Sequence, residues 1–365
     1  MAKIKAAKLQ EPGRGSLLVT PVWETSAVAA GHAGYAEHHV ILCDLAVDPK
    51  LLKWNCTSLR GGQDQSIAER YSDDAVACFE RIQTILRGKP QGQVLVQIVA
   101  GNDGEHALLA GLSALLKTAA LENPRITGQF LLVPADITAD TLARHLEDEK
   151  SGGRDPVIHY HGGVRQVPRW QEIPAETEPS PIAFQDDGVY LITGGMGGLG
   201  MLFAEEILER TGQARVVLAG RSPGPSESRA RVSYAQVDVS DLAQVTRLFA
   251  TIREEHGQLN GILHCAGMVA DNFILKKSVD EFRDVLAPKV SGTFHLDQAS
   301  RDVELDFFVL FSSTAAALGN PGQADYACAN GFLDAFAAYR NGLVALEQRH
   351  GRTRSIDWPL WQAGG

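Results

Sequence analysis

A glycine-rich segment between an expected strand and an expected helix constrains the fold of this chain more than any other feature. Thr193–Gly200 has the sequence Thr-Gly-Gly-Met-Gly-Gly-Leu-Gly. The apolar run Gly188–Thr193 leads into it, and a helical pattern over Leu199–Arg210 follows. Glycines let a backbone approach a pyrophosphate closely, and the start of a helix offers free N–H groups and the positive end of its dipole. The segment therefore predicts a dinucleotide-binding strand–turn–helix unit.

Strands and helices are expected to alternate from this turn to the end of the chain. Further strands are predicted at Ala214–Ala219, Val232–Val237, Gly261–His264, Asp306–Phe311 and Arg354–Asp357, and helices at Asp241–His256, Phe282–Ser300 and Ala324–Glu347. Ser240 is expected to cap the helix that begins at Asp241, because its hydroxyl can satisfy a free backbone N–H group. This alternation predicts a doubly wound parallel sheet of the α/β class.

The first half of the chain shows a weaker form of the same alternation. Strands are predicted near Leu17–Trp23, Val40–Cys43, Val94–Val99, Phe130–Val133 and Val157–Tyr160, and helices near Asp73–Leu86, His106–Leu121 and Ala139–Glu149. No turn there resembles a phosphate loop. The Pro-containing segment Trp170–Asp187 marks the expected boundary between two units, residues 1–180 and 181–365.

Composition argues against several classes of protein. The chain of 365 residues is 44% hydrophobic and 21% charged, which is ordinary for a globular protein, and no apolar run approaches the roughly 18 residues that cross a bilayer. The net charge of -10 gives no electrostatic support for nucleic acid binding. Five cysteines without a Cys-x-x-Cys pair argue against a disulfide framework or a zinc site. The N-terminal residues lack the apolar segment of a secretory signal, so a cytoplasmic location is expected.

The strand after the glycine-rich turn ends in a residue that bears on cofactor choice. It leads into Gly220-Arg221-Ser222, where an NAD-binding protein usually has an acid for the ribose 2′-hydroxyl. An arginine suits a 2′-phosphate instead, so NADPH is expected, with Arg221 as its main contact and Ser222 as a second. Asp238, at the end of the third strand of this half, is expected either near the adenine or simply ahead of a helix.

Ser313, Tyr326 and Asn330 form a spaced set near the end of the chain. Ser313 follows a buried strand, Tyr326 lies thirteen residues later, and Asn330 is one helical turn beyond on the same face. This set resembles the short-chain dehydrogenase/reductase superfamily, in which such a serine and tyrosine bind and protonate a carbonyl. The superfamily's usual Tyr-x-x-x-Lys has asparagine in the last position here, and a lysine occurs instead at Lys289, where ordinary members have asparagine.

This exchange of lysine and asparagine is similar to the ketoreductase domains of modular polyketide synthases. Three further segments resemble those domains: His264-Cys265-Ala266-Gly267, Asn320-Pro321-Gly322-Gln323 and Asp357-Trp358-Pro359-Leu360-Trp361. The resemblance implies that the first half is a truncated, cofactor-free Rossmann-like structural subdomain. It also suits a bacterial synthase whose acyltransferase acts in trans. Family members continue into a lid helix, so a chain that ends at Gly365 is expected to lack that lid.

The resemblance implies NADPH-dependent reduction of a β-ketoacyl thioester carried by an acyl carrier protein, with neighbouring synthase domains as further partners. It makes Tyr326 the proton donor, Lys289 the cation that favours its phenolate, Ser313 the donor to the carbonyl oxygen, and Asn330 the residue that positions Lys289 or a relay water. The expected cofactor contacts are Thr193, Gly194, Gly195, Met196, Gly197, Gly198, Leu199, Gly200, Arg221, Ser222, Asp238, Val239, Ala266, Gly267, Lys289 and Tyr326.

Residues near the tyrosine bear on the configuration of the product. One class in the family has Leu-Asp-Asp after the fourth strand, where this sequence has Val269-Ala270-Asp271. The opposite class has tryptophan at the position of Leu318, and Pro321 also matches the first class. Asp271, Leu318 and Pro321 thus favour the B-type, which gives a D-configured β-hydroxyl.

Other interpretations of the chain remain open at this point. It could be a stand-alone short-chain reductase acting on a small ketone, or an inactive ketoreductase that serves as a scaffold. His159 and His161 alternate on a strand as a candidate metal pair, but no third ligand is evident and no metal is expected. Cys328 is interpreted as a packing residue and His264 as a structural histidine.

Overall fold

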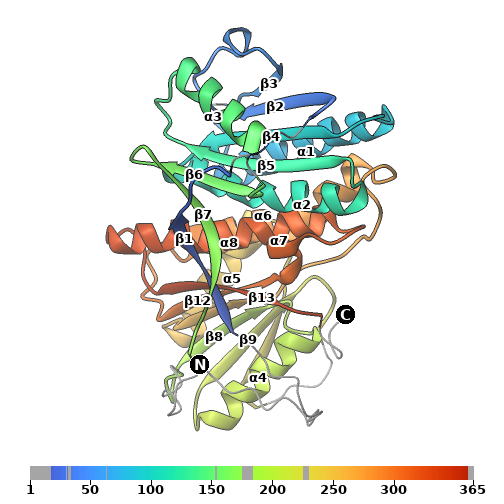
Figure 1. Ribbon diagram of the computed structural model, residues 1–365. Coiled ribbons are helices and arrows are strands. Elements are labelled where there is room, and N and C mark those ends of the chain that lie inside the picture. The colour runs from blue at the N-terminus through green and yellow to red at the C-terminus, as the bar shows by residue number, and fades with distance from the viewer. Residues whose placement is uncertain are drawn as a thin grey trace, which may run out of the picture.

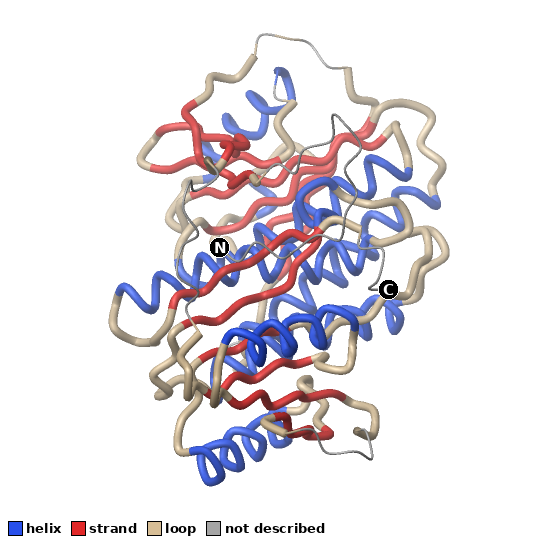
Figure 2. The backbone as a smooth tube through the Cα atoms, turned by 90° about the horizontal axis from the view of Figure 1, so that it is seen from below, coloured by secondary structure: helices blue, strands red, loops and turns tan. Residues whose placement is uncertain are grey.

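The computed structural model describes residues 18–29, 31, 34–62, 64–152, 154–174, 184–224 and 230–360. Two β-sheets lie one above the other, the first built from the N-terminal half and the second from the C-terminal half (Figure 1). Helices α2 (Ser113–Glu122), α6 (Val279–Ala299) and α8 (Ala324–Ala345) run between the sheets. Figure 2, in which strands are red and helices blue, shows helices packed beside strands throughout the molecule.

The C-terminal sheet confirms the predicted doubly wound arrangement. Its strands are β8 (Val189–Thr193), β9 (Arg215–Gly220), β10 (Val232–Gln236), β11 (Gly261–His264), β12 (Phe307–Ser313) and β13 (Arg352–Trp358). They are all parallel, in the order β10-β9-β8-β11-β12-β13. This is the order of dinucleotide-binding Rossmann folds, in which ligands bind beyond the carboxyl ends of the strands where the order reverses. That point lies here between β8 and β11.

The remaining helices of this half follow the sequence closely, with one corrected cap. They are α4 (Gly198–Arg210), α5 (Leu242–His256) and the short α7 (Thr314–Leu318), which was not predicted. The prediction that Ser240 caps α5 is wrong, because the side chain of Asp241 accepts the N–H of Gln244. The Ser240 hydroxyl instead donates to Asp238 Oδ1 over 2.6 Å. Asp241 is the capping residue instead of Ser240, because it lies three residues before Gln244, the spacing at which a capping side chain reaches a free N–H group.

The N-terminal sheet is mixed rather than fully parallel. Its strands are β1 (Val19–Thr25), β2 (Glu37–Cys43), β3 (Asn55–Leu59), β4 (Val94–Gly101), β5 (Ile126–Val133), β6 (Val157–His161) and β7 (Val164–Glu172). Its helices are η1 (Pro49–Leu51), α1 (Ile67–Arg87), η2 (Gly104–Leu112) and α3 (Ala139–Gly152), besides α2. The parallel strands lie in the order β3-β2-β4-β5-β6, which is the Rossmann order with its third strand missing. The fold class is therefore as predicted, with the first unit truncated.

Strand β7 pairs antiparallel with both β6 and β1, and its last residues overlap the start of the expected boundary segment. Gly162 and Gly163, with φ of +56° and +77°, form the two-residue turn that folds β7 back on β6. Trp170 and Glu172 therefore lie in a strand, not in a connecting segment. Residues 175–183 of the expected boundary lie outside the described residues.

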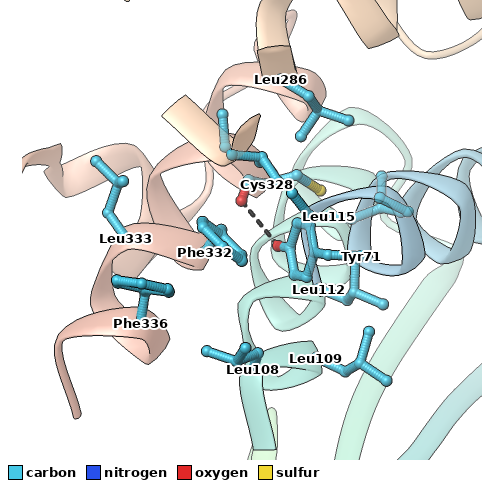
Figure 3. Close-up of a cluster of buried hydrophobic side chains, with 14 of the residues drawn as sticks. Tyr71, Leu108, Leu109, Leu112, Leu115, Leu286, Cys328, Phe332, Leu333 and Phe336 are labelled. Carbon is cyan, nitrogen blue, oxygen red and sulfur yellow. Dashed lines mark hydrogen bonds between the residues drawn. The ribbon is translucent and has the colours of Figure 1, made fainter. Parts of the chain in front are cut away.

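One buried cluster of side chains joins the two halves (Figure 3). Tyr71 of α1 packs against Phe332 of α8 with ring centroids 4.8 Å apart, and its hydroxyl donates to the carbonyl of Cys328 over 2.9 Å. Gly111 of η2 and Gly331 of α8 meet backbone to backbone, since a Cβ on Gly331 would lie 2.5 Å from the carbonyl oxygen of Gly111. The cluster therefore packs as a single core. Among helices of the described residues, none has both the length and the apolar character needed to cross a bilayer.

Candidate active site

The glycine-rich turn lies at the carboxyl end of β8, at the point where the strand order reverses. Gly194 has φ of +66°, which a side chain would disfavour, and a Cβ there would lie 2.8 Å from the backbone nitrogen of Ala266. A Cβ on Gly200 would lie 2.7 Å from Cα of Gly195, so the first turn of α4 packs tightly on the loop. These glycines therefore bring the turn close to the end of β11.

The start of α4 fits the phosphates of a dinucleotide. Its N-cap residue is Gly197, which has no side chain that could bond to the N–H groups of the first turn. Free N–H groups and the positive helix end are then available to an anion. The turn Thr193–Gly200 and the helix start can thus hold a pyrophosphate, as their sequence predicts.

Arg221 and Ser222 follow directly after β9 and are exposed. Side chains of the neighbouring strand β10 hold both backbones, because Gln236 donates to the carbonyl of Arg221 over 2.9 Å and Tyr234 to that of Ser222 over 2.5 Å. The position of Arg221 at the end of the second strand suits a ribose 2′-phosphate.

Asp238 and Val239 lie between β10 and α5. Asp238 Oδ1 accepts the N–H of Ser240 over 2.9 Å and its hydroxyl over 2.6 Å, so this acid organises the turn before the helix. Val239 is buried, and its carbonyl bonds to Nδ1 of His295 over 3.0 Å. The contact of Asp238 with the adenine stays a prediction.

His264 connects the glycine-rich turn to α6 and acts as the structural histidine that was expected. Its Nε2 lies 3.0 Å from the carbonyl of Pro288, which can only accept, so Nε2 carries the proton. Its Nδ1 then accepts from the hydroxyl of Thr193 over 2.6 Å. Burial, together with nearby Lys289, lowers the pKa of His264 to about 3, so the ring is neutral. This chain of bonds fixes the backbone next to Lys289.

Lys289 of α6 is buried close to Tyr326. Its Nζ donates to the carbonyl of Phe311 over 2.7 Å and lies 5.8 Å from the centroid of the Tyr326 ring. A Cβ on Gly267 would lie 2.9 Å from Cε of Lys289, so glycine leaves room for the lysine. Burial lowers the pKa of Lys289 to about 8, and nearby Cys265 and Asp334 oppose this only in part.

Ser313, Tyr326 and Asn330 lie on neighbouring elements at the same end of the sheet. Ser313 ends β12, and its Oγ accepts the N–H of Ala315 over 3.2 Å, which leaves its own proton free to donate. Tyr326 is half-buried on the first turn of α8. Asn330 lies one turn later and donates from Nδ2 to the carbonyl of Tyr326 over 2.7 Å, while its Oδ1 is buried without a hydrogen-bond partner. That free acceptor can accept a hydrogen bond from a water or a cofactor hydroxyl.

The three residues expected to control configuration lie on the loop after β11, at the end of α7 and on the turn before α8. Asp271 is exposed and accepts a hydrogen bond from Gln323 over 3.0 Å. Pro321 is exposed on the turn before α8, and Leu318 is 63% exposed at the end of α7. Leu318 and Pro321 thus precede the tyrosine on one side, and Asp271 approaches it from the loop after β11.

Sequence reasoning missed several polar residues that hold these loops. Lys277 and Asp325 form a fully buried ion pair over 2.6 Å, and Asp325 also accepts the N–H of Tyr326 over 2.8 Å. From the N-terminal half, Glu122 accepts two backbone N–H groups of the loops. The only signal of these contacts in the sequence was the acid Asp325 directly before Tyr326. The contacts themselves join residues that are far apart in the sequence.

The remaining candidates behave as packing groups. His159 packs against Trp23 with ring centroids 5.0 Å apart and against His161 at 5.4 Å. The described residues contain no group of three or more His, Cys, Asp or Glu side chains that could hold a metal ion. Cys328 is fully buried in the shared core, and burial raises the pKa of its thiol well above the usual value.

Comparison with known proteins assigns the chain to a family. A family model described as a KR domain matches residues 188–363. The polyketide synthases PksN and PksL of Bacillus subtilis (strain 168) are 41% and 40% identical over 96% of this chain, which spans 7% and 8% of their lengths. A crystal structure of a ketoreductase domain from the bacillaene assembly line is 38% identical, with a TM-score of 0.88 over 96% of this chain and 86% of that one. An N-terminal ketoreductase from the macrolactin assembly line is 27% identical, with a TM-score of 0.76 over 95% of this chain and 84% of that one.

The parallel sheet and the glycine-rich turn at its reversal point define a dinucleotide-binding fold of the Rossmann class. The chain belongs, more particularly, to the ketoreductase (KR) domain family. Its similarity to KR domains of modular polyketide synthases extends over both halves.

Proposed function

We propose that this chain reduces the β-keto group of an acyl thioester on an acyl carrier protein, with NADPH as the cofactor, as one domain of a bacterial polyketide synthase. The observation that carries this proposal is the position of Lys289. It places a buried cation 5.8 Å from the ring of Tyr326, although the lysine is absent from the common position four residues after that tyrosine. The glycine-rich turn lies at the same end of the sheet.

The proposed reaction assigns one step to each side chain. When bound, the nicotinamide supplies a hydride to the carbonyl carbon of the substrate. Tyr326 donates its phenolic proton to the carbonyl oxygen, and the hydroxyl of Ser313 donates a hydrogen bond to the same oxygen. A phenol gives up its proton poorly near neutrality, since its pKa is about 10. The positive charge of Lys289 stabilises the phenolate and so makes that transfer easier.

The residues proposed for cofactor binding surround this set. Thr193–Gly200 and the start of α4 would hold the pyrophosphate, and Arg221 with Ser222 the 2′-phosphate. Ala266 and Gly267 would line the nicotinamide end, because they lie against the glycine-rich turn and Lys289 respectively. The free Oδ1 of Asn330 would accept a hydrogen bond from a water that links Lys289 to solvent.

For residues 1–180 we propose a structural role without a cofactor. The position that matches the glycine-rich turn follows β2, and there the chain forms only the three-residue helix η1 before β3. Next to it, Arg70 pairs with Glu105 over 2.7 Å and with Asp44 over 3.8 Å. The charged side chains at this point, Arg70, Asp44 and Glu105, are thus paired with one another. Calorimetric titration should give one NADPH per chain, and two sites would contradict this proposal.

The direct test of function is reduction of a short β-ketoacyl thioester, either free or on a carrier protein. NADPH consumption and chiral analysis of the alcohol should show a single D-configured β-hydroxy product if the B-type assignment is correct. The bond from Gln323 to Asp271 supports that assignment, since it fixes the remaining acid of the loop beside Tyr326. No NADPH consumption with any such thioester would refute the catalytic proposal.

Replacing Arg221 by alanine should reduce the preference for NADPH over NADH. Charge-assisted hydrogen bonds to a phosphate contribute about 1.5 to 3 kcal/mol, which corresponds to at least roughly tenfold in affinity. Because NADH has no 2′-phosphate, the loss should fall on the Kd for NADPH alone. Fluorescence titration with both cofactors checks this. An unchanged ratio of the two Kd values would exclude the role given to Arg221.

The rate at low NADPH should fall as the pH rises above about 8. Because burial lowers the pKa of Lys289 to about 8, the cation is present below that pH and is lost above it. The profile of kcat/KM for NADPH reports groups of the free enzyme, so it should lose about tenfold per pH unit on its basic side. Initial rates between pH 6 and 10 test this, and a flat profile up to pH 9.5 would contradict it.

A further inference from the structure

A single carboxylate of the N-terminal half holds two loops of the C-terminal half. Glu122 is the last residue of α2. Its Oε2 accepts the N–H of Ile274 over 2.8 Å, and its Oε1 accepts the N–H of Gly322 over 2.9 Å. Each oxygen of one side chain thus holds a different segment, and both partners are backbone groups that no other side chain in the described residues is shown to receive.

The two segments that Glu122 contacts flank the tyrosine of the site. One is the loop 265–278 after β11, which carries Asp271, and the other is the turn 319–323 before α8, which carries Pro321. They also bind one another, because the N–H of Asn272 donates to the carbonyl of Gly322 over 2.8 Å. A shift of either segment would therefore move the turn that leads into α8, on whose first turn Tyr326 lies.

Two other side chains of the N-terminal half each bond to only one of the two segments. Gln83 of α1 donates to the carbonyl oxygens of Ile274 and Lys277 over 2.7 and 2.9 Å, and Thr118 of α2 accepts the N–H of Asn320 over 3.2 Å. These contacts position each segment against the N-terminal half. Among them, only Glu122 bonds to both segments, so it adds a shared anchor in the N-terminal half to the direct bond between the segments.

We infer that Glu122 is a positioning residue for the configuration of the product, acting through the two segments beside Tyr326. This inference rests on the proposed reductase function. A ketone can present either face to the hydride donor. Small displacements of the segments that border the substrate change which face is favoured. A side chain that is anchored in the N-terminal half and bonds to both segments limits their displacement. It therefore limits which face of the ketone is reduced.

The chemistry of a carboxylate suits this role. Both of its oxygens accept hydrogen bonds, and bonds from an N–H group to a charged acceptor are stronger than neutral ones. An amide at the same place has only one accepting oxygen, and its NH₂ group would face a backbone N–H. Glu122→Gln should therefore keep one of the two bonds and lose the other, whereas Glu122→Ala loses both.

The test compares Glu122→Gln and Glu122→Ala with Glu80→Gln, a matched change on the exposed face of α1 in the same half. Three quantities are measured on the full chain: the Kd for NADPH, hydrogen exchange of the amides in 271–277 and 319–323, and the ratio of D to L alcohol from a β-ketoacyl thioester. We expect an unchanged Kd, exchange at least tenfold faster in both segments, and a D to L ratio at least tenfold lower for the alanine variant. The glutamine variant should be intermediate, and Glu80→Gln should match the parent.

Other outcomes separate this inference from the proposed function. If a variant loses thermal stability but keeps the parent's exchange rates and alcohol ratio, Glu122 is only a structural residue and the inference is wrong. If the alanine variant does not fold, the glutamine variant decides, because a parental ratio and parental exchange there also overturn it. If the parent reduces no thioester, the proposed function fails. Exchange rates in the two segments still show whether Glu122 holds them, and unchanged rates would refute it independently.

Discussion

Replacing Tyr326 by phenylalanine should remove nearly all ketone reduction while NADPH still binds. The phenolic proton is the one that the proposed reaction delivers to the substrate oxygen, and general acid catalysis by a positioned side chain contributes about 10² to 10⁴ in rate. The groups proposed for the cofactor phosphates lie on other elements, at Thr193–Gly200 and Arg221. We therefore expect kcat to fall by at least about a hundredfold while the Kd for NADPH changes less than about threefold.

Tyr339 provides the matched control for this experiment. It lies on the same helix α8, is half-buried, and packs against Phe336 with ring centroids 5.9 Å apart. Tyr339→Phe removes the same hydroxyl from the same helix away from the site, so it should keep the parent's rate. If Tyr326→Phe retained more than about a third of the parent's kcat, another group would have to supply the proton, and Tyr326 would lose its assigned role.

A fragment that begins at Phe184 should not fold into a stable protein. Removing the preceding residues would expose the face of α8 and α6 that packs against the N-terminal half. Phe282 of α6 would lose its stacked partner Phe79, at 4.6 Å between ring centroids, and Phe332 would lose Tyr71. Deletion of one large buried side chain costs about 3 to 5 kcal/mol, and a domain has only about 5 to 15 kcal/mol in total. The loss of several such partners should exceed the stability of the remainder.

Solubility, circular dichroism and thermal unfolding of the fragment and of the full chain measure this effect. Phe332→Ala in the full chain gives a graded version, with an expected loss of about 3 to 5 kcal/mol in the free energy of unfolding. A soluble fragment with cooperative unfolding and the parent's rate of ketone reduction would overturn the structural role proposed for the first half.

The sequence predicts the C-terminal sheet and its central site because those signals are local. The glycine-rich turn lies within eight consecutive residues, and the strands of a buried parallel sheet are apolar runs that stand out between amphipathic helices. Ser313, Tyr326 and Asn330 are close in sequence as well. Lys289 lies farther away, and the resemblance to a family, rather than any spacing rule, connected it to Tyr326.

The features that the sequence did not predict depend on partners that are distant along the chain. Glu122 meets Ile274 and Gly322, which are 152 and 200 residues away, and nothing near Glu122 in the sequence indicates either contact. Lys277 and Asp325 are 48 residues apart and are buried only because they neutralise each other. The hairpin of β6 and β7 is different, because Gly162-Gly163 directly after the predicted strand Val157–Tyr160 was a visible signal for a turn.

The contact of Gly111 with Gly331 limits how such a domain can be recombined with others. Each glycine has the backbone of the other within 3.0 Å of the place where its own Cβ would be, so any side chain on either one drives η2 and α8 apart. A chimera that joins the first half of one ketoreductase to the second half of another takes the two sides of this glycine contact from different parents. The helices η2 and α8 can pack this closely only where both parents have glycine at the contact. The unit that can be exchanged between assembly lines is therefore the pair of halves, together with the helix contact that joins them.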